Sequence, residues 1–263
     1  MNLAPGRPLF RPARLWVCAV LLLTSACASA PPSAPTGRVI ASDVPQPDEV
    51  VLAEGVRVRR LSPGVWLHVT HAGEEWGHTP ANGLLIEEEA SSLLVETGWT
   101  VPQARVLLDW ARDSLHRPVR AAVVTHFHMD RIGGVPELAE RGIPLFAREE
   151  TARLAAGQGH PIVFQRLEDE QQWGPLTLFF PGAGHTRDNL VVWHPNSRLL
   201  YGGCFVKDAS ARDLGNVEDA DVAAWPASLE RLRARFPDAR TVLPGHHAPG
   251  GLELLTHTRA LLR

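Results

Sequence analysis

Cysteine is scarce in this 263-residue chain, with residues of that type only at positions 18, 27 and 204. The first two lie in a segment with the pattern of an export signal, so Cys204 is the only thiol of the remaining chain. An intrachain disulfide is therefore excluded there. In an oxidising compartment a lone thiol is either buried and inert or held as a thiolate by a metal ion.

Excess positive charge is also missing. The chain has 26 Lys and Arg against 29 Asp and Glu, for a net charge of -3 and a pI near 6.5. Proteins that bind nucleic acids usually carry a basic patch or stripe. This balance excludes nucleic acid as an expected partner.

No apolar run near the N-terminus reaches the roughly 20 residues that a membrane-spanning helix needs. Segment 1–30 instead has arginines, then the short apolar run 15–23, then the small residues 24–30, which is the order of an export signal. Ala-Ser-Ala at 28–30 fits ordinary cleavage, whereas 23–27 resembles a bacterial lipoprotein box that would make Cys27 the lipidated first residue. Both predict a periplasmic protein, and the second predicts outer-membrane attachment through the lipid alone.

Residues 31–48 are rich in proline and small polar residues and are predicted to form a flexible tether before a domain over 49–263. Within that domain, strand patterns and helical patterns occur in two successive groups. This order predicts an α/β fold with two mixed sheets packed face to face and helices on the outer faces, a four-layer αββα sandwich. Strands are expected at 56–61, 65–71, 83–88, 92–96, 119–125, 176–180, 190–194, 198–201 and 241–243, and helices at 101–115, 135–141, 149–156, 224–236 and 252–262.

His126, His128 and Asp130 follow the apolar run 121–124 at spacings of two residues. In an extended loop these side chains lie on one side, and zinc accepts both imidazole nitrogen and carboxylate oxygen. The alternative is a polar loop in which the histidines are caps or surface groups.

Three further candidate ligands repeat this placement at the end of a predicted strand. They are His185 in a glycine-rich turn, Cys204 after two glycines, and His246 after Pro244-Gly245. Loops at strand ends are common places for functional groups. Four such clusters in one domain indicate a metal centre.

Together these residues resemble the metallo-β-lactamases, within them the two-zinc subclass that has a cysteine ligand, and the resemblance runs from about Val50 to the C-terminus. Arg131 supports that subclass, because most relatives with this fold have a second histidine directly after the motif aspartate. The matching residues are His126, His128, Asp130, His185, Cys204, Lys207, Asn216, His246 and the segment 224–229.

The resemblance implies two zinc ions per chain. His126, His128 and His185 would hold one, and Asp130, Cys204 and His246 the other. It also implies hydrolysis of the amide bond of β-lactam antibiotics, expected to be penicillins, cephalosporins and carbapenems, by a metal-bound hydroxide that Asp130 orients. Such an activity confers antibiotic resistance.

Further roles follow from the same resemblance. Lys207 would pair with the substrate carboxylate, the Asn216 amide would help to stabilise the oxyanion, and Trp76 would fold over the substrate from the segment that joins two strands. Arg131 and Glu96 would support the metal ligands from behind.

The chain departs from the family pattern at three positions. Glu96 stands where aspartate is usual, Met129 where relatives often have a polar residue, and His247 where glycine is usual. We assign His246 rather than His247 as the ligand because His246 directly follows the Pro-Gly turn.

The runner-up hypothesis is another hydrolase of this fold that acts on a lactone or thioester and has no need of Lys207 and Asn216. A third is a non-catalytic zinc-binding or sensory protein, which is disfavoured because structural zinc sites are closed by four ligands. The expected partner is a small-molecule substrate, and the expected state is a monomer.

Overall fold

The computed structural model describes residues 48–263. The predicted export signal at 1–30, the lipidation alternative at Cys27 and all but the last residue of the predicted tether at 31–48 lie outside the described residues. The domain bounds therefore stay predictions. Among residues 48–263, none of the helices is long and apolar enough to cross a membrane.

The first sheet has eight strands in sequence order, antiparallel from β1 to β5 and parallel from β5 to β8. The strands are β1 (Glu49–Ala53), β2 (Val56–Ser62), β3 (Val65–His71), β4 (Pro80–Glu87), β5 (Ser92–Val95), β6 (Val119–Val123), β7 (Leu145–Ala147) and β8 (Gln165–Arg166).

The second sheet has five strands in the order β13-β12-β11-β10-β9, and only the β12–β13 pair is parallel. Both sheets are therefore mixed. The strands are β9 (Glu170–Trp173), β10 (Leu176–Phe179), β11 (Val191–His194), β12 (Leu199–Gly203) and β13 (Thr241–Pro244).

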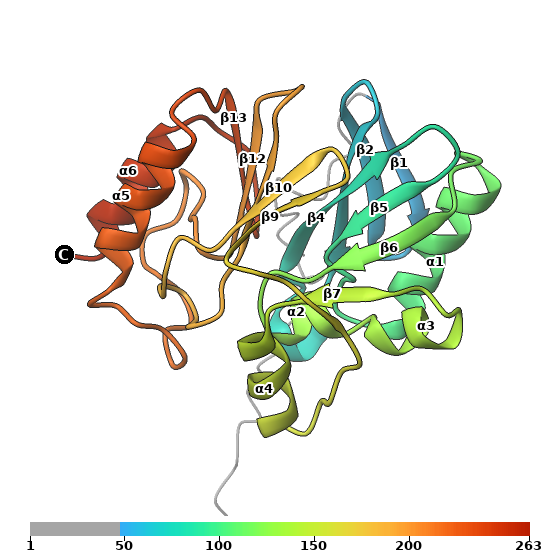
Figure 1. The fold of residues 1–263 in the computed structure, drawn as a ribbon, viewed down its shortest axis with the longest axis horizontal. Coiled ribbons are helices and arrows are strands. Elements are labelled where there is room, and N and C mark those ends of the chain that lie inside the picture. Colours follow the sequence, from blue (N-terminus) through green and yellow to red (C-terminus); the bar gives the residue numbers. More distant parts are fainter. Residues whose placement is uncertain (1–47) are drawn as a thin grey trace, which may run out of the picture. The chain divides into compact units, whose positions relative to one another are not determined.

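Helices cover the outer face of each sheet (Figure 1). α1 and α3 lie outside the first sheet, and α5 and α6 outside the second. The helices are α1 (Val101–Asp113), α2 (Met129–Ile132), α3 (Val135–Glu140), α4 (Glu149–Gly157), α5 (Trp225–Arg235) and α6 (Glu253–Leu261), with a short 3-10 helix η2 (Glu74–Trp76).

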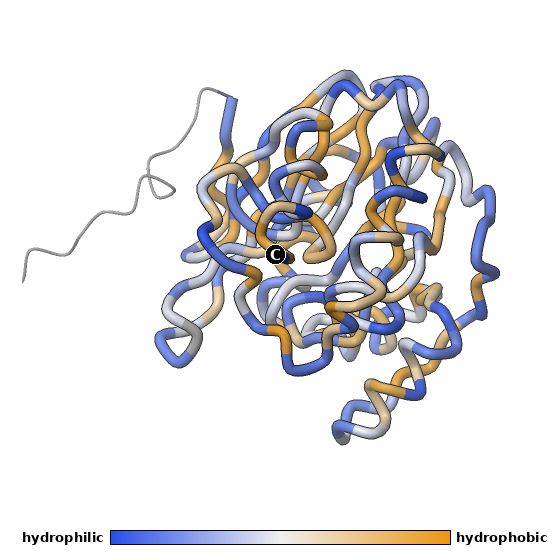
Figure 2. The backbone as a smooth tube through the Cα atoms, turned by 90° about the vertical axis from the view of Figure 1, so that its left-hand side faces the viewer, coloured by the Kyte–Doolittle hydropathy of each residue, from blue (hydrophilic) through white to orange (hydrophobic). Residues whose placement is uncertain are grey.

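The main core lies between the two sheets. In β3, Val65, Leu67 and Val69 belong to this core, as the two-residue period of a strand requires, and Leu178 and Leu243 meet them from the second sheet. Hydrophobic stretches, in orange, accordingly gather in the interior of the domain, while hydrophilic stretches, in blue, are frequent at its periphery (Figure 2). The predicted four-layer αββα sandwich is confirmed.

The outer helices follow from local sequence signals. The Thr100 side chain caps α1 by accepting a hydrogen bond from the Gln103 backbone N–H at 3.4 Å, and a proline lies in the first turn. The buried residues of α1, at positions 104, 107, 108 and 111, form the stripe expected of an amphipathic helix. α1 therefore begins where the sequence predicts and packs one face on the sheet.

The expected strands and helices are all present, with ends that shift by up to three residues. The prediction of an extended loop through Asp130 was wrong in part, because α2 begins at Met129 and places Asp130 in its first turn. Strands β1, β7, β8 and β9 were not expected. β8 has two residues and β9 is mostly polar, so neither carries a clear strand pattern.

Candidate metal centre

The four predicted ligand clusters lie at one edge of the two sheets. His126 and His128 follow β6, and His185 follows β10. β10 and β12 run in the same direction, since both are antiparallel to β11, and β13 is parallel to β12. The loops that carry His185, Cys204 and His246 therefore leave the second sheet on the same side.

His126, His128 and His185 form the first ligand group, because they offer ligand atoms that all lie within 4.8 Å of one another. His185 Nε2 lies 3.2 Å from His128 Nδ1. Two nitrogens bound tetrahedrally to zinc at about 2.0–2.1 Å would lie about 3.3 Å apart. The spacing of these two nitrogens fits a shared zinc ion.

The hydrogen-bonding of His126 also fits a metal. Its Nδ1 lies 3.1 Å from Thr125 Oγ1, whereas its Nε2 is buried and has no hydrogen-bond partner among residues 48–263. Burial, followed by the neighbouring His128 and His185, holds the pKa of His126 well below its usual value. The ring is therefore neutral, as a zinc ligand must be.

Asp130, Cys204 and His246 lie side by side next to the first group. Cys204 Sγ is 3.1 Å from His246 Nε2 and 3.5 Å from Asp130 Oδ2, and His246 Nε2 is 3.3 Å from Asp130 Oδ2. Asp130 and Cys204 also form a candidate metal-binding group with His126. The thiol, carboxylate and imidazole are the donor types that zinc accepts.

Charge is concentrated in this second group. Burial lowers the pKa of His246, but the charges and hydrogen bonds of Cys204 and Asp130 overcome it and raise the pKa to about 10. Pro80 O, 2.6 Å from His246 Nδ1, holds the ring so that Nε2 faces Cys204 and Asp130. A cation is therefore strongly favoured beside Asp130 and Cys204.

Arg131 is fully buried behind this group. Its Nη2 lies 2.7 Å from Asp130 Oδ2 and donates to Cys204 Sγ at 2.8 Å and to Gly245 O at 3.0 Å. Its Nη1 donates to the Asn82 carbonyl at 2.7 Å and to the Tyr201 hydroxyl at 2.9 Å. One guanidinium thus holds both Asp130 and Cys204 against the backbone.

Glu96 lies behind the tri-histidine group. Its carboxylate accepts hydrogen bonds from the Thr125 hydroxyl at 2.5 Å and from the Thr125 N–H at 3.2 Å. Burial, opposed by Arg131, raises the pKa of Glu96 to about 7. Since Thr125 also contacts His126 Nδ1, Glu96 supports that ligand through a hydroxyl.

Sequence reasoning missed two supporting residues. Asp219 Oδ2 lies 2.9 Å from His128 Nε2, which leaves His128 Nδ1 toward the other histidines. Asn82 Nδ2 donates to Pro244 O at 2.9 Å and to His247 O at 2.8 Å. Nothing in the sequence sets Asp219 apart from the other acidic residues of its loop.

A cavity of about 650 Å³ borders both ligand groups. Lys207, Asn216, His247 and Met129 line it together with five of the six candidate ligands, all but His126. His247 is exposed, and no contact with Asp130 or Cys204 is found for it among the described residues, in contrast to His246. Trp76 ends η2 between β3 and β4, and its side chain lies outside what the structure describes.

The sequence matches known proteins over most of its length. Residues 76–246 match the family model of the metallo-β-lactamase superfamily. The chain is 37% identical to metallo-β-lactamase type 2 of Bacteroides fragilis, over 81% of this chain and 88% of that protein. It is also 37% identical to metallo-β-lactamase type 2 of Bacillus cereus, over 79% of this chain and 83% of that protein.

Solved structures agree with the sequence matches. A metallo-β-lactamase from Erythrobacter litoralis superposes with a TM-score of 0.78 at 35% identity, covering 82% of this chain and 99% of that one. The FIM-1 metallo-β-lactamase of Pseudomonas aeruginosa, in a mono-zinc form, has a TM-score of 0.77 at 36% identity, covering 81% and 97%. The resemblance seen in the sequence is confirmed, and the chain belongs to the metallo-β-lactamase superfamily.

Proposed function

We propose that this protein is a zinc-dependent hydrolase that opens the amide bond of β-lactam antibiotics. The observation that carries the proposal is the pair of adjacent ligand groups, one of three imidazoles and one with two acidic side chains, at the border of a single cavity. Relatives named metallo-β-lactamases support the same activity.

His126, His128 and His185 would hold one zinc ion, and Asp130, Cys204 and His246 a second. When bound, zinc lowers the pKa of water toward about 7 and so supplies hydroxide at neutral pH. Asp130 belongs to the second group, and its carboxylate also lies within 4.8 Å of a ring nitrogen of His126. Burial raises the pKa of Asp130, but the Arg131 charge and the hydrogen bond with His246 outweigh it and hold that pKa well below its usual value, so the carboxylate is ionised and can accept a hydrogen bond. It would orient the attacking water toward the lactam carbonyl.

Lys207 would bind the substrate carboxylate. Its ammonium borders the cavity close to Gly215 and 5.8 Å from the centre of the Trp225 ring. Burial lowers the pKa of Lys207, while the acidic groups of Cys204 and Asp130 oppose that change. A carboxylate seated beside Lys207 would direct the lactam ring toward the ligand groups.

Asn216 borders the same cavity from the loop after Gly215, so its amide would stabilise the developing oxyanion. Its Oδ1 accepts the Glu218 N–H at 2.9 Å, which restrains the side chain in the loop. Trp76 would cover bound substrate from the β3–β4 connection.

Penicillins, cephalosporins and carbapenems would be substrates, and resistance to them would be the consequence. The protein would act as a periplasmic monomer, either free or held to the outer membrane by a lipid on Cys27.

An assay of the zinc-loaded protein tests this function. We expect ring opening of a penicillin, a cephalosporin and a carbapenem, and loss of the activity with a zinc chelator. A lactone and a thioester serve as comparison substrates, and preference for either would favour the runner-up hydrolase. Failure to open any lactam ring after zinc loading would refute the proposal.

A further inference from the structure

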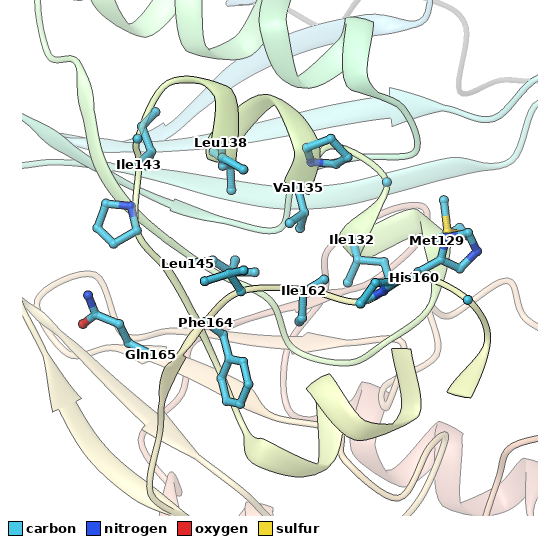
Figure 3. Close-up of a pocket in the computed structure, with 18 residues that line it drawn as sticks. Met129, Ile132, Val135, Leu138, Ile143, Leu145, His160, Ile162, Phe164 and Gln165 are labelled. Atoms are coloured by element: carbon cyan, nitrogen blue, oxygen red, sulfur yellow. The ribbon is translucent and has the colours of Figure 1, made fainter. Parts of the chain in front are cut away.

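A second cavity, of about 700 Å³, lies next to the metal centre and takes no part in the reaction proposed above. Helices α2 and α3, the turn at 142–144 and the segment 159–165 enclose it. Figure 3 shows its lining side chains. The volume is within the range of about 300–1,000 Å³ that is typical of small-molecule sites.

The lining is mainly apolar. Ile132, Val135, Leu138 and Leu145 are buried at the cavity, and they belong to the core between the first sheet and its helices. Polar side chains are confined to its ends: His160 lies at the same end as Met129, and Gln165 lies at the end opposite (Figure 3). Such a lining selects an apolar group.

Several lining side chains still expose apolar surface. Ile143, Ile162, Phe164 and Met129 pack against the same core but are only partly buried. An apolar group that entered the cavity would remove this surface from water, which is favourable by about 25 cal/mol per Å². The cavity therefore has an unused capacity for apolar contact.

Met129 connects this cavity to the metal centre. It borders both cavities and lies in the chain between the ligands His128 and Asp130. The neighbouring residues Gln158 and Gly159 border the metal cavity and the apolar cavity respectively. A methionine side chain is flexible and adapts to the shape of a bound group. A molecule held at the metals can therefore extend past Met129.

We propose that the apolar cavity binds an aromatic or aliphatic substituent of the substrate while the lactam ring lies at the metal centre. The proposal rests on the proposed function and assigns α3 and the segment 159–165 to substrate selection. Continuity through Met129 favours a substituent of the substrate over an unconnected ligand.

A selectivity measurement tests this assignment. Two penicillins are compared, one with a free amino group on the nucleus and one with a naphthoyl side chain. Ala139 is an exposed lining residue of α3, and Ala139→Trp would fill part of the cavity. We expect the kcat/KM ratio of the naphthoyl penicillin to the nucleus to fall by about 10- to 100-fold, the range for apolar pocket contacts, mainly through KM.

Glu140→Trp is the matched control. Glu140 is the next residue of α3, is exposed and is not part of the lining. The same bulk at that position should leave the ratio at the wild-type value. An unchanged ratio in Ala139→Trp would overturn the proposal even if both penicillins are hydrolysed.

Methyl NMR of the zinc-loaded protein gives a readout that does not depend on turnover. Naphthamide should shift the methyl signals of Ile132, Ile143 and Ile162. The signal of Ile86, which lies between the sheets, should not move. In Ala139→Trp the naphthamide-induced shifts should be absent. Absence of shifts would overturn the proposal. Contacts from these methyl groups to residues before Asp48 would also overturn it, by naming a segment of this chain as the occupant. Shifts without any hydrolysis would refute the lactamase function and leave the cavity assigned to apolar ligands.

Discussion

Single residues behind the ligands determine which atoms face the metals. Asp219 lies 2.9 Å from His128 Nε2, so His128 presents Nδ1 to the other two histidines. Residues that orient a ligand in this way typically contribute about 10- to 100-fold to metal affinity or activity. Asp219→Ala should weaken zinc binding at the tri-histidine group by that factor, as measured by competition with a chromophoric chelator.

The control for Asp219→Ala is Glu218→Ala. It removes one negative charge from the neighbouring position, and no contact with a proposed ligand is found for Glu218 in the described part of the chain. Equal loss of zinc affinity in both variants would show that loop charge, rather than the contact with His128, is responsible.

His68 is a buried histidine outside the metal centre and predicts a pH-dependent stability. Burial lowers its pKa from 6.5 to about 4, while its Nε2 lies 3.0 Å from the Val95 carbonyl. The unfolded chain therefore binds a proton at this residue between pH 6.5 and 4 that the folded chain does not. The free energy of unfolding should fall as the pH is lowered through this window, by about 2 kcal/mol at pH 5 relative to pH 8.

Urea unfolding of chelator-treated protein at pH 8 and pH 5 measures this contribution. Between pH 8 and pH 5, the free energy of unfolding of His68→Phe should fall by about 2 kcal/mol less than that of the wild type, because phenylalanine does not titrate. The exposed His116, replaced in the same way, should leave the wild-type dependence. An equal pH dependence in wild type and His68→Phe would contradict a neutral buried imidazole.

At the scale of elements, Asn82 joins β4 of the first sheet to the loop after β13 of the second. Its side chain donates to the Pro244 and His247 carbonyls, and its N–H donates to Gly245 O at 2.8 Å. Asn82→Ala would leave two carbonyl acceptors without their donor. Each one that stays buried would lower the free energy of unfolding by about 1–3 kcal/mol. We expect lower stability in urea and weaker zinc binding at the group that contains His246.

Asn196→Ala, in the exposed turn between β11 and β12, is the comparison for Asn82→Ala. It removes the same amide from the surface and should stay within about 0.5 kcal/mol of the wild type. Wild-type zinc affinity in a destabilised Asn82→Ala protein would separate the sheet connection from the metal centre.

The sequence allowed prediction of those elements that repeat a local signal. Apolar strands that end in Gly or Pro followed by His or Cys identify the candidate ligands, because a strand end fixes where the next residue lies. Strand β9 gives no such signal, since three of its four residues are Glu or Gln and it forms a strand by pairing with β10. Asp219 and Asn82 act through partners 91 and 162 residues away in the chain. Local sequence patterns do not indicate which residues meet across such separations.

For the whole molecule, each ligand group draws residues from both sheets. His126 and His128 come from the loop after β6 and Asp130 from α2, which follows that loop, whereas His185, Cys204 and His246 follow strands of the second sheet. Metal ions bound here would join the two halves of the sandwich. Ligands that bind only the folded state stabilise it, by about 2.7 kcal/mol per site when free zinc is 100 times its Kd.

Zinc removal should therefore lower the denaturant midpoint of the whole domain in a single transition.

Metal analysis should find about two zinc ions per chain before removal. Cys204→Ser should lose mainly one of them and a corresponding part of the zinc-dependent stability. Magnesium at the same concentration should not replace zinc, because it prefers oxygen ligands and the first group offers only nitrogen. Coincident unfolding curves with and without zinc would mean that the metal does not connect the two sheets. A midpoint gain that Cys204→Ser leaves untouched would place all of the stabilisation at the three histidines.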